Sequence, residues 1–317
     1  MLTRVKPTKP TKPSKLARRI ASLGRVFELD TIVEQTMGVA EVAEYYELSF
    51  GAYRRRHSSE GSLHLALNDG GRFDPAGFSG QAARLVALWD GQRAADVIEL
   101  GFGHGYNLGV LAPRLPGTQF VGVDIAQRHV THVQAMLQER GISNVQAHQG
   151  DFHALPWADA SFDQAYSIEA FCYARDHASA LAEVARVLRP GGTLTLYDGY
   201  LTRPLDAMQA DEALAARLAA KGMAMDNLPV ADDLIAHALA AGFELARRTP
   251  LDALVAPNVK RIERLVAVFV RWPWLARRLL ARLNPIAMRN VLAGYLMGPA
   301  MESGIWTYQE LVLRKRV

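Results

Sequence analysis

Short apolar segments alternate with helical segments over residues 96–197, and this alternation constrains the fold more than any other feature of the chain. The apolar segments are Asp96–Leu100, Phe120–Asp124, Val145–Gln149, Phe162–Ile168 and Thr193–Tyr197. The helical segments between them are Asn107–Arg114, Gln127–Arg140 and Asp176–Leu188. Strands and helices in alternation form a mostly parallel sheet with helices on both faces. The sequence therefore predicts an α/β fold.

Segments on both sides of this region add helices and two more strands. On the N-terminal side we predict a helix over Arg25–Leu48, a long irregular loop over Tyr53–Phe78 and a helix over Ser79–Trp89. On the C-terminal side we predict helices over Ala210–Lys221 and Asp232–Ala241, followed by a strand over Phe243–Arg247. After it we predict a basic helical region over Asp252–Ala300, with breaks at Pro273, Pro285 and Pro299, and a last strand over Trp306–Arg314. Long loops inside compact domains are usually functional lids or disordered.

Charge is unevenly distributed along the chain. Residues 1–27 contain eight Lys and Arg and no acid, and residues 260–289 contain eight more against one acid. Residues 28–259 contain 17 basic and 29 acidic residues. An acidic body repels phosphates, so we expect no nucleic-acid partner. The basic flanks leave two interpretations open: contact with an anionic membrane, or solvated segments without a partner.

Other features of the whole chain concern its location. The chain has 317 residues, half of them hydrophobic, and one cysteine, Cys172, which fits a reducing compartment. The apolar stretches are too short to span a membrane, and the first thirty residues lack the apolar region of a secretory signal. We expect a soluble, cytoplasmic protein, with membrane association and homo-oligomerisation left open.

The first apolar segment leads into a glycine-rich loop, Val97-Ile98-Glu99-Leu100-Gly101-Phe102-Gly103-His104-Gly105. Glycines let the backbone turn tightly and let a ligand approach it closely. The glycine spacing differs from the dinucleotide fingerprint, although an NAD-binding domain is the main alternative. A carboxylate two residues before the first glycine disfavours a pyrophosphate and suits a ligand with ammonium and sulfonium groups. We therefore expect S-adenosylmethionine as the cofactor, bound by Glu99, Gly101 and Gly103.

Two further acids follow later apolar segments. Asp124 ends the second segment, where an acidic side chain can accept hydrogen bonds from both ribose hydroxyls. Asp151 follows the third segment, and we expect it near the adenine amino group with Phe152 stacked on the base. We also assign Ile125 and Ile168 to the cofactor site.

With these motifs, residues 80–200 closely resemble the class I S-adenosylmethionine-dependent methyltransferases. The resemblance implies a Rossmann-like, seven-stranded sheet whose last two strands, Phe243–Arg247 and Trp306–Arg314, form an antiparallel pair. The resulting division of the chain is a basic disordered tail (1–27), an N-terminal helical cap and substrate lid (28–90), a cofactor-binding core (91–251), a basic helical insert (252–300) and the final core strand (301–317).

The segment at the end of the fourth strand, Ser167-Ile168-Glu169-Ala170-Phe171-Cys172-Tyr173, indicates which class of molecule accepts the methyl group. This segment resembles the Ile-Glu-Ala stretch of sterol and isoprenoid C-methyltransferases. Tyr45-Tyr46 and Gly61-Ser62-Leu63-His64-Leu65 resemble the paired tyrosines and the Ser-Phe-His-Phe motif of that group, with Leu63 in place of the Phe. We assign Tyr45, Tyr46 and His64 to the substrate site on this resemblance, and Phe171 and Tyr173 as further aromatic residues that can face the substrate.

Glu169 has a role in the chemistry of such a reaction. Methyl transfer to a neutral alkene leaves a carbocation, which a nearby anion stabilises before it removes a proton. We predict Glu169 as the cation stabiliser and base, with Tyr46 and His64 beside it. Aromatic faces add about 0.5–2 kcal/mol each through cation–π contact. We expect no metal, because His129 and His132 lack a third ligand nearby.

Several alternatives stay open at this stage. A prenyl diphosphate is an alternative acceptor, held by Arg54-Arg55-Arg56. An O- or N-methyltransferase of a small natural product would use Glu169 or a histidine as general base. A non-catalytic scaffold with the same fold belongs to another class, and the intact glycine loop argues against it. The insert Lys260–Arg289 is either a helix on a bilayer surface or a helical cap.

Overall fold

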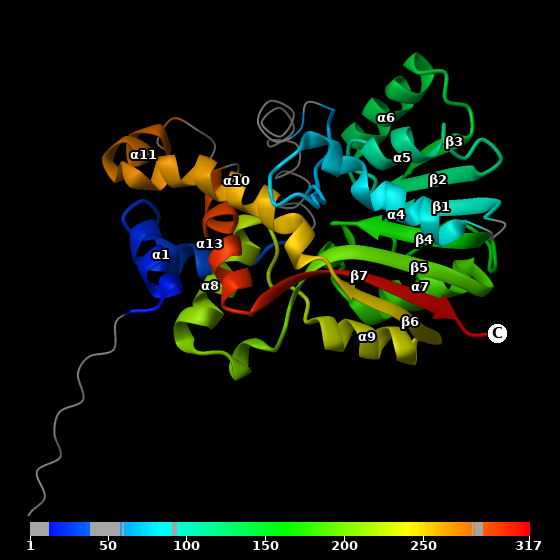
Figure 1. The fold of residues 1–317 in the computed structure, drawn as a ribbon. Coiled ribbons are helices and arrows are strands. Elements are labelled where there is room, and N and C mark those ends of the chain that lie inside the picture. The colour runs from blue at the N-terminus through cyan, green and yellow to red at the C-terminus, as the bar shows by residue number, and fades with distance from the viewer. Residues whose placement is uncertain (1–12, 39–57, 59, 91–93, 281, 283–287) are drawn as a thin grey trace, which may run out of the picture.

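The computed structural model describes residues 13–38, 58, 60–90, 94–280, 282 and 288–317. It contains a seven-stranded sheet that occupies one side of the molecule (Figure 1). In spatial order the strands are β3 (Val145–Gln149), β2 (Gln119–Asp124), β1 (Asp96–Leu100), β4 (Phe162–Ile168), β5 (Leu188–Leu201), β7 (Trp306–Lys315) and β6 (Phe243–Pro250). Strands β1–β5 pair in parallel, and β7 lies antiparallel between β5 and β6. The predicted α/β sheet and its antiparallel last pair are confirmed.

Helices cover both faces of the sheet. One face carries α4 (Gly80–Trp89), α5 (Tyr106–Leu111) and α6 (Gln127–Glu139), and the other carries α7 (His177–Val187) and α9 (Ala231–Ala240). Leu108 and Val133 of the first group join the core that contains Phe120, whereas Leu181 and Leu234 of the second join the opposite core. The apolar positions in each helix recur at the 3.6-residue period, so each helix buries one stripe.

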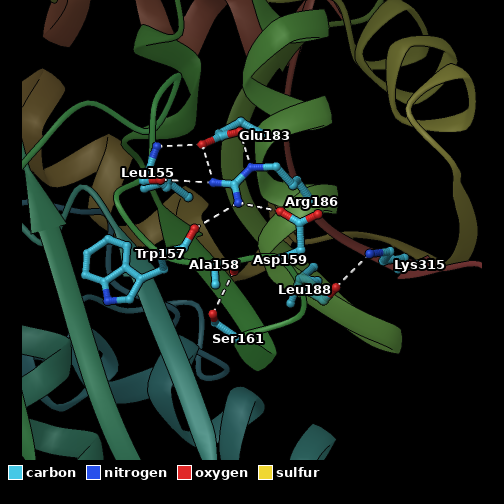
Figure 2. A network of polar contacts seen from close by, with 9 residues as sticks. All are labelled: Leu155, Trp157, Ala158, Asp159, Ser161, Glu183, Arg186, Leu188 and Lys315. Carbon is cyan, nitrogen blue, oxygen red and sulfur yellow. Dashed lines mark hydrogen bonds and ion pairs between the residues drawn. The ribbon is translucent and has the colours of Figure 1, made fainter.

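Arg186 of α7 holds the segment between β3 and β4 in place through hydrogen bonds (Figure 2). Its guanidinium donates to the carboxylates of Glu183 and Asp159 and to the backbone carbonyls of Leu155 and Trp157, at 2.8–3.0 Å. A planar guanidinium with five donors suits this set of acceptors. The contacts anchor the chain just before β4, the strand that ends next to Glu169.

A group of helices lies beside the sheet (Figure 1). It comprises α1 (Lys15–Leu23), α2 (Leu29–Glu34), α8 (Ala210–Gly222), α10 (Asp252–Arg271), α11 (Pro273–Leu280) and α13 (Asn290–Glu302). Helix α13 packs against α1, α8 and α10. Short 3-10 turns occur at Pro75–Ser79 (η1), Phe171–Tyr173 (η2) and Leu205–Ala207 (η3). Within the described chain, no helix combines the length and the apolar character that a membrane span requires.

The N-terminal region differs from its prediction. Residues 15–23, assigned to a disordered tail, form α1, because Ser14 caps the helix by accepting a hydrogen bond from the Ala17 amide and Leu16 and Leu23 are buried. The predicted helix over 25–48 is wrong in extent, since α2 ends at Glu34 and residues 35–38 are not helical. The remainder of that prediction lies outside the described residues.

Two further predictions differ from the structure. Pro299, predicted as a break, lies within α13 and does not interrupt it. The strand predicted over Thr193–Tyr197 is longer, because β5 begins at Leu188 and runs to Leu201, with an irregular register opposite the start of β4. Pro273 does separate α10 from α11, as a proline at the first position of a helix does.

Candidate active site

The glycine-rich loop follows β1 and packs closely against the chain that follows β4. Gly101 has φ 76°, a conformation that L-residues with a side chain rarely adopt. A Cβ atom at Gly101 would lie 2.4 Å from the Cβ of Ala170, so this approach requires glycine. The Gly101 amide donates to the Val123 carbonyl of β2 at 2.8 Å, which holds the loop over the neighbouring strand.

The loop forms one wall of a cavity of about 730 Å³ at the carboxyl ends of the parallel strands. This is the edge at which open α/β sheets bind their ligands. The cavity extends from Asp124 at the end of β2, past Glu169, to Trp306 and Tyr308 of β7. Eleven residues predicted for the site line it: Glu99, Gly101, Gly103, Asp124, Ile125, Asp151, Phe152, Ile168, Glu169, Tyr173 and His64.

Glu99 presents a buried carboxyl group to this cavity. Burial, together with a smaller contribution from the charge of Asp124, raises its pKa to about 8, against the effect of hydrogen bonds from Tyr166 and Asn107. The Tyr166 hydroxyl donates to Glu99 Oε2 at 2.9 Å. The Asn107 Oδ1 atom is buried and accepts no hydrogen bond from the described residues. A carboxyl and a vacant amide oxygen side by side fit an ammonium group, which would favour the ionised carboxylate.

Asp124 is held by the backbone around it. Its two carboxylate oxygens accept hydrogen bonds from the amides of Gly103 and Ala126, at 2.8 and 2.9 Å, and His129 Nδ1 lies 3.1 Å from one of them. Each carboxylate oxygen can accept more than one hydrogen bond, so capacity for ribose hydroxyls remains. Ile125 follows and is 38% exposed, which leaves an apolar surface open to the cavity.

Asp151 and Phe152, which follow β3, also line the cavity. Asp151 accepts hydrogen bonds from His153 and from Arg175, which together hold the pKa of that carboxyl below its usual value although burial acts in the opposite direction. Phe152 stacks on Phe171 with ring centroids 5.4 Å apart. Phe171 was expected to bind the substrate, but it is buried in the core behind Phe152 and is not among the cavity-lining residues.

Glu169 projects from a strained position at the end of β4. Its φ of 51° lies in the left-handed region, which costs a non-glycine residue about 1–3 kcal/mol and is concentrated at functional sites. Glu169 Oε1 accepts a hydrogen bond from the Leu65 amide at 2.7 Å. Burial, together with the charge of Asp198, raises the pKa of Glu169 to about 8. Hydrogen bonds from the Leu65 amide and the Tyr308 hydroxyl act in the opposite direction.

Asp198 and Tyr308 are site residues that the sequence reasoning missed. Asp198, on β5, is buried and accepts hydrogen bonds from the amides of Cys172 and Gly199 at 3.0 and 2.9 Å. Burial raises its pKa to about 6. Tyr308 lies between Glu169 and Gln81, whose amide donates to the Tyr308 hydroxyl at 3.2 Å. The fifth apolar segment ends just before Asp198, so its position after a parallel strand was the available signal.

His64 and Tyr173 have different surroundings. His64 is buried at the cavity wall, its Nδ1 lies 3.1 Å from the Leu65 carbonyl oxygen, and its ring meets that of Tyr106 edge-on at 5.8 Å. The Tyr173 hydroxyl donates to the Met223 carbonyl at 2.8 Å, which fixes the ring at the cavity. Tyr45, Tyr46 and Arg54–Arg56 lie outside the described residues.

Beyond Glu169 the cavity is lined by several apolar side chains. They include Met223, Met225, Leu228, Met297 and Trp306, and the polar residues Asp226, Asn227, Asp233 and His237 line the cavity as well. Among the described residues that line the whole cavity, Arg175 is the one lysine or arginine, and it pairs with Asp151. Apolar walls with a few polar groups are typical of sites for hydrophobic ligands.

Comparison with known proteins agrees with this geometry. Residues 98–196 match a family described as "Methyltransferase domain". The chain is 28% identical over 211 residues to 24-methylenesterol C-methyltransferase 2 of Oryza sativa subsp. japonica, which covers 66% of this chain and 55% of that protein. This chain spans about half the length of the curated relatives it matches.

Two solved structures share the fold. A mycolic acid cyclopropane synthase superposes with a TM-score of 0.72 at 15% identity, covering 89% of this chain and 100% of that one. The geranyl diphosphate C-methyltransferase of Streptomyces coelicolor A3(2) superposes with a TM-score of 0.63 at 14% identity, covering 86% and 98%. At these identities the likeness concerns the fold alone.

Residues 98–196 are therefore a methyltransferase domain, and the chain has the fold of the class I S-adenosylmethionine-dependent methyltransferases. Its sequence relatives include sterol C-methyltransferases. The cofactor of this class is S-adenosylmethionine, in agreement with the prediction from Glu99 and the glycine loop.

Proposed function

We propose that the protein transfers a methyl group from S-adenosylmethionine to an alkene carbon of a sterol-like or isoprenoid lipid. The observation that carries this proposal is the position of the Glu169 carboxyl group. It lies between the glycine loop and the part of one continuous cavity that Met223, Leu228 and Met297 line. An acid in such surroundings is unusual unless it faces a positive charge during the reaction.

The cofactor is assigned to the end of the cavity formed by β1, β2 and β3. Glu99 and Asn107 face the position we assign to its ammonium group, Asp124 to its ribose, and Asp151 and Phe152 to its adenine. Gly101 and Gly103 allow its close approach, and Ile125 and Ile168 supply apolar contacts. When bound, S-adenosylmethionine supplies an electrophilic methyl group on a sulfonium.

In the proposed reaction Glu169 acts after the methyl carbon has been attacked. The alkene π electrons form the new C–C bond as the S–C bond breaks, and the positive charge moves to the neighbouring alkene carbon. The Glu169 carboxylate stabilises that cation, then accepts a proton from an adjacent carbon, whose C–H electrons restore a double bond. Asp198 contributes a second negative charge in the same cavity.

The acceptor class follows from the walls of the cavity. Burying an apolar chain against Met223, Leu228 and Met297 is favourable, whereas a diphosphate requires cations. The cavity lining described here has Arg175 as its one arginine, already paired with Asp151. We therefore favour a neutral lipid. A prenyl diphosphate would depend on Arg54–Arg56, which lie outside the described residues.

A hydroxyl or amine acceptor is the second candidate, because His64 lies in the same cavity and can serve as a general base together with Glu169. The experiment that separates the candidates uses S-adenosylmethionine labelled with a trideuterated methyl group. The protein is incubated with a neutral sterol or polyene, with geranyl diphosphate and with a phenol, and the products are identified by mass spectrometry and NMR.

The expected product is a C-methylated lipid that retains all three deuterium atoms, because Glu169 removes a proton from the acceptor. A cyclopropane ring with two deuterium atoms would show that the proton comes from the transferred methyl group. A methyl ether would favour the second candidate. Cofactor binding without transfer to any acceptor of the panel would contradict both assignments of acceptor.

A further inference from the structure

The C-terminal half of α10 and all of α11 present an apolar surface to solvent. Ten large apolar side chains are exposed among the described residues, and six of them lie within the fifteen residues from 265 to 279. They are Leu265, Val268, Trp272, Trp274, Leu275 and Leu279, which we call the tryptophan surface. Trp274 is 68% exposed. Single exposed apolar residues are common, but a cluster of this kind marks an interaction site.

The same two helices already bury another face inside the protein. Val270 and Ala276 are buried, and the Phe269 ring packs against Phe27 with centroids 6.2 Å apart. Packing within the chain therefore accounts for one side of α10 and α11. The tryptophan surface is the second, outward side, and no described segment covers it.

Arginines accompany the tryptophan surface without acids to neutralise them. The exposed ones are Arg264, Arg271, Arg277, Arg278 and Arg282, and none forms an ion pair with another described residue. Glu263 is the one acid between residues 260 and 289, and Arg19 of α1 pairs with it. The surface is thus both apolar and positively charged.

We propose that the tryptophan surface docks the protein on an anionic lipid bilayer. Helices that lie in a membrane interface place Trp and Leu at the acyl boundary and Arg at the lipid phosphates, and that combination is present here. An acidic protein or a nucleic acid would use the arginines but leave the exposed tryptophans and leucines in contact with water. This inference does not depend on the proposed function, because vesicle binding requires neither cofactor nor acceptor.

The docking surface is connected to the cavity through the helices that carry it. Asn258, near the middle of α10, accepts a hydrogen bond from the Ala66 amide at 2.9 Å and so positions the segment that contains His64 and Leu65. Met297 of α13, which packs against α10, lines the cavity. Docking through the far half of α10 would hold the cavity at a fixed orientation to the bilayer.

The test measures co-sedimentation of the full chain with vesicles of phosphatidylcholine alone or mixed with phosphatidylglycerol. We expect binding to the mixed vesicles that weakens with added salt. The double change Arg277→Ser and Arg278→Ser should lower the partition constant about 20- to 30-fold, at about fivefold for each arginine. Trp272→Ser with Trp274→Ser should lower it at least about tenfold.

Matched controls are Leu239→Ser on α9 and Arg314→Ser on β7, which are exposed but lie away from the tryptophan surface. Both should bind vesicles as the unchanged protein does, and thermal unfolding of every variant should show that the fold is kept. Equal binding by all variants, or no binding to anionic vesicles, would overturn the proposal. So would sedimentation equilibrium showing that the tryptophans mediate dimerisation in solution.

Discussion

At the scale of single residues, Glu169 allows the most direct test of the proposed chemistry. Glu169→Gln keeps the oxygen that accepts the Leu65 amide but removes the charge and the proton acceptor. We expect turnover to fall about 10²- to 10⁴-fold, the usual contribution of a general base. Affinity for S-adenosylhomocysteine, measured by calorimetry, should be almost unchanged. Glu244→Gln, an exposed change on β6, is the control, and wild-type turnover in Glu169→Gln would contradict the assigned role.

Glu99 predicts a pH dependence of cofactor binding. Its pKa of about 8 in the ligand-free protein means that it is largely protonated at pH 7, while an ammonium group favours its carboxylate. Affinity for S-adenosylhomocysteine should therefore rise between pH 6 and 8, by at most about tenfold per pH unit, and level off above. Calorimetry in buffers of different ionisation enthalpy should detect the released proton. In Glu99→Gln both the rise and the proton release should disappear; their persistence would exclude Glu99 as the source.

The raised pKa values also affect the stability of the ligand-free protein, which should fall as the pH rises, whereas cofactor affinity rises. The pKa values of Glu99 and Glu169 are raised from 4.5 to about 8, so the protonated forms stabilise the native state. That stabilisation is complete below about pH 4.5 and is lost as the pH rises through about 8. In the proposed arrangement, bound cofactor reverses the balance at both residues, because its ammonium group at Glu99 and its sulfonium near Glu169 stabilise the charged carboxylates.

At the scale of elements, the loop between β1 and α5 depends on glycine at one position above all. Gly101→Ala would force a side chain into φ 76° and place its Cβ 2.4 Å from that of Ala170. We expect a loss of about 1–3 kcal/mol in the free energy of unfolding and a large loss of cofactor affinity. Denaturant unfolding and calorimetry measure the two effects. Gly117→Ala, where no atom lies within 4 Å, should change neither, and a similar effect of both changes would contradict the argument.

The elements differ in how well the sequence predicts them. Strands β1–β4 were located closely. The mostly buried strands β1, β2 and β4 leave largely apolar runs, as parallel strands with both faces covered do, whereas the edge strand β3 buries only Val145 and Ala147. Helix α1 was missed because its Pro- and Lys-rich flank dominates the local composition, while its stability comes from burying Leu16 and Leu23 against distant helices. Tertiary contacts of that kind override local propensity.

Site residues also divide into those that the sequence predicts and those that depend on tertiary contacts. Residues next to strand ends, such as Glu99 and Asp124, could be inferred from spacing, because parallel strands bring their carboxyl ends to one edge. Tyr308 could not, since it reaches Glu169 only when β7 inserts between β5 and β6, 139 residues further along the chain (308 − 169). Phe171 follows Glu169 by two residues, which suggested a place in the substrate site, but the 3-10 turn η2 directs its side chain into the core.

At the scale of the whole molecule, α1 joins helices that are distant in the sequence. Its Arg19 pairs with Glu263 of α10 and lies over the ring of Tyr295 of α13, with the guanidinium carbon 4.0 Å from the ring centroid. Val26 and Phe27, just after α1, are buried as well. The N-terminal region thus stabilises the group of helices that forms one wall of the cavity and carries the tryptophan surface.

Two deletions distinguish this structural role from that of the basic residues before it. Removing residues 1–12 takes away Arg4, Lys6, Lys9 and Lys12 but leaves Ser14 and every described contact in place. Removing residues 1–27 also takes away Leu16, Leu23, Val26 and Phe27 from the core. Since one buried apolar side chain contributes about 1.5–3 kcal/mol, the longer deletion should cost several kcal/mol of unfolding free energy.

Thermal unfolding and vesicle binding, measured on both deletions, separate the two effects. The 1–12 deletion should unfold at the temperature of the full chain and lose part of its affinity for anionic vesicles, because four positive charges are gone. The 1–27 deletion should unfold at a markedly lower temperature. If both deletions unfolded like the full chain, α1 would not support the helices around α13, and its burial in the core would have no energetic consequence.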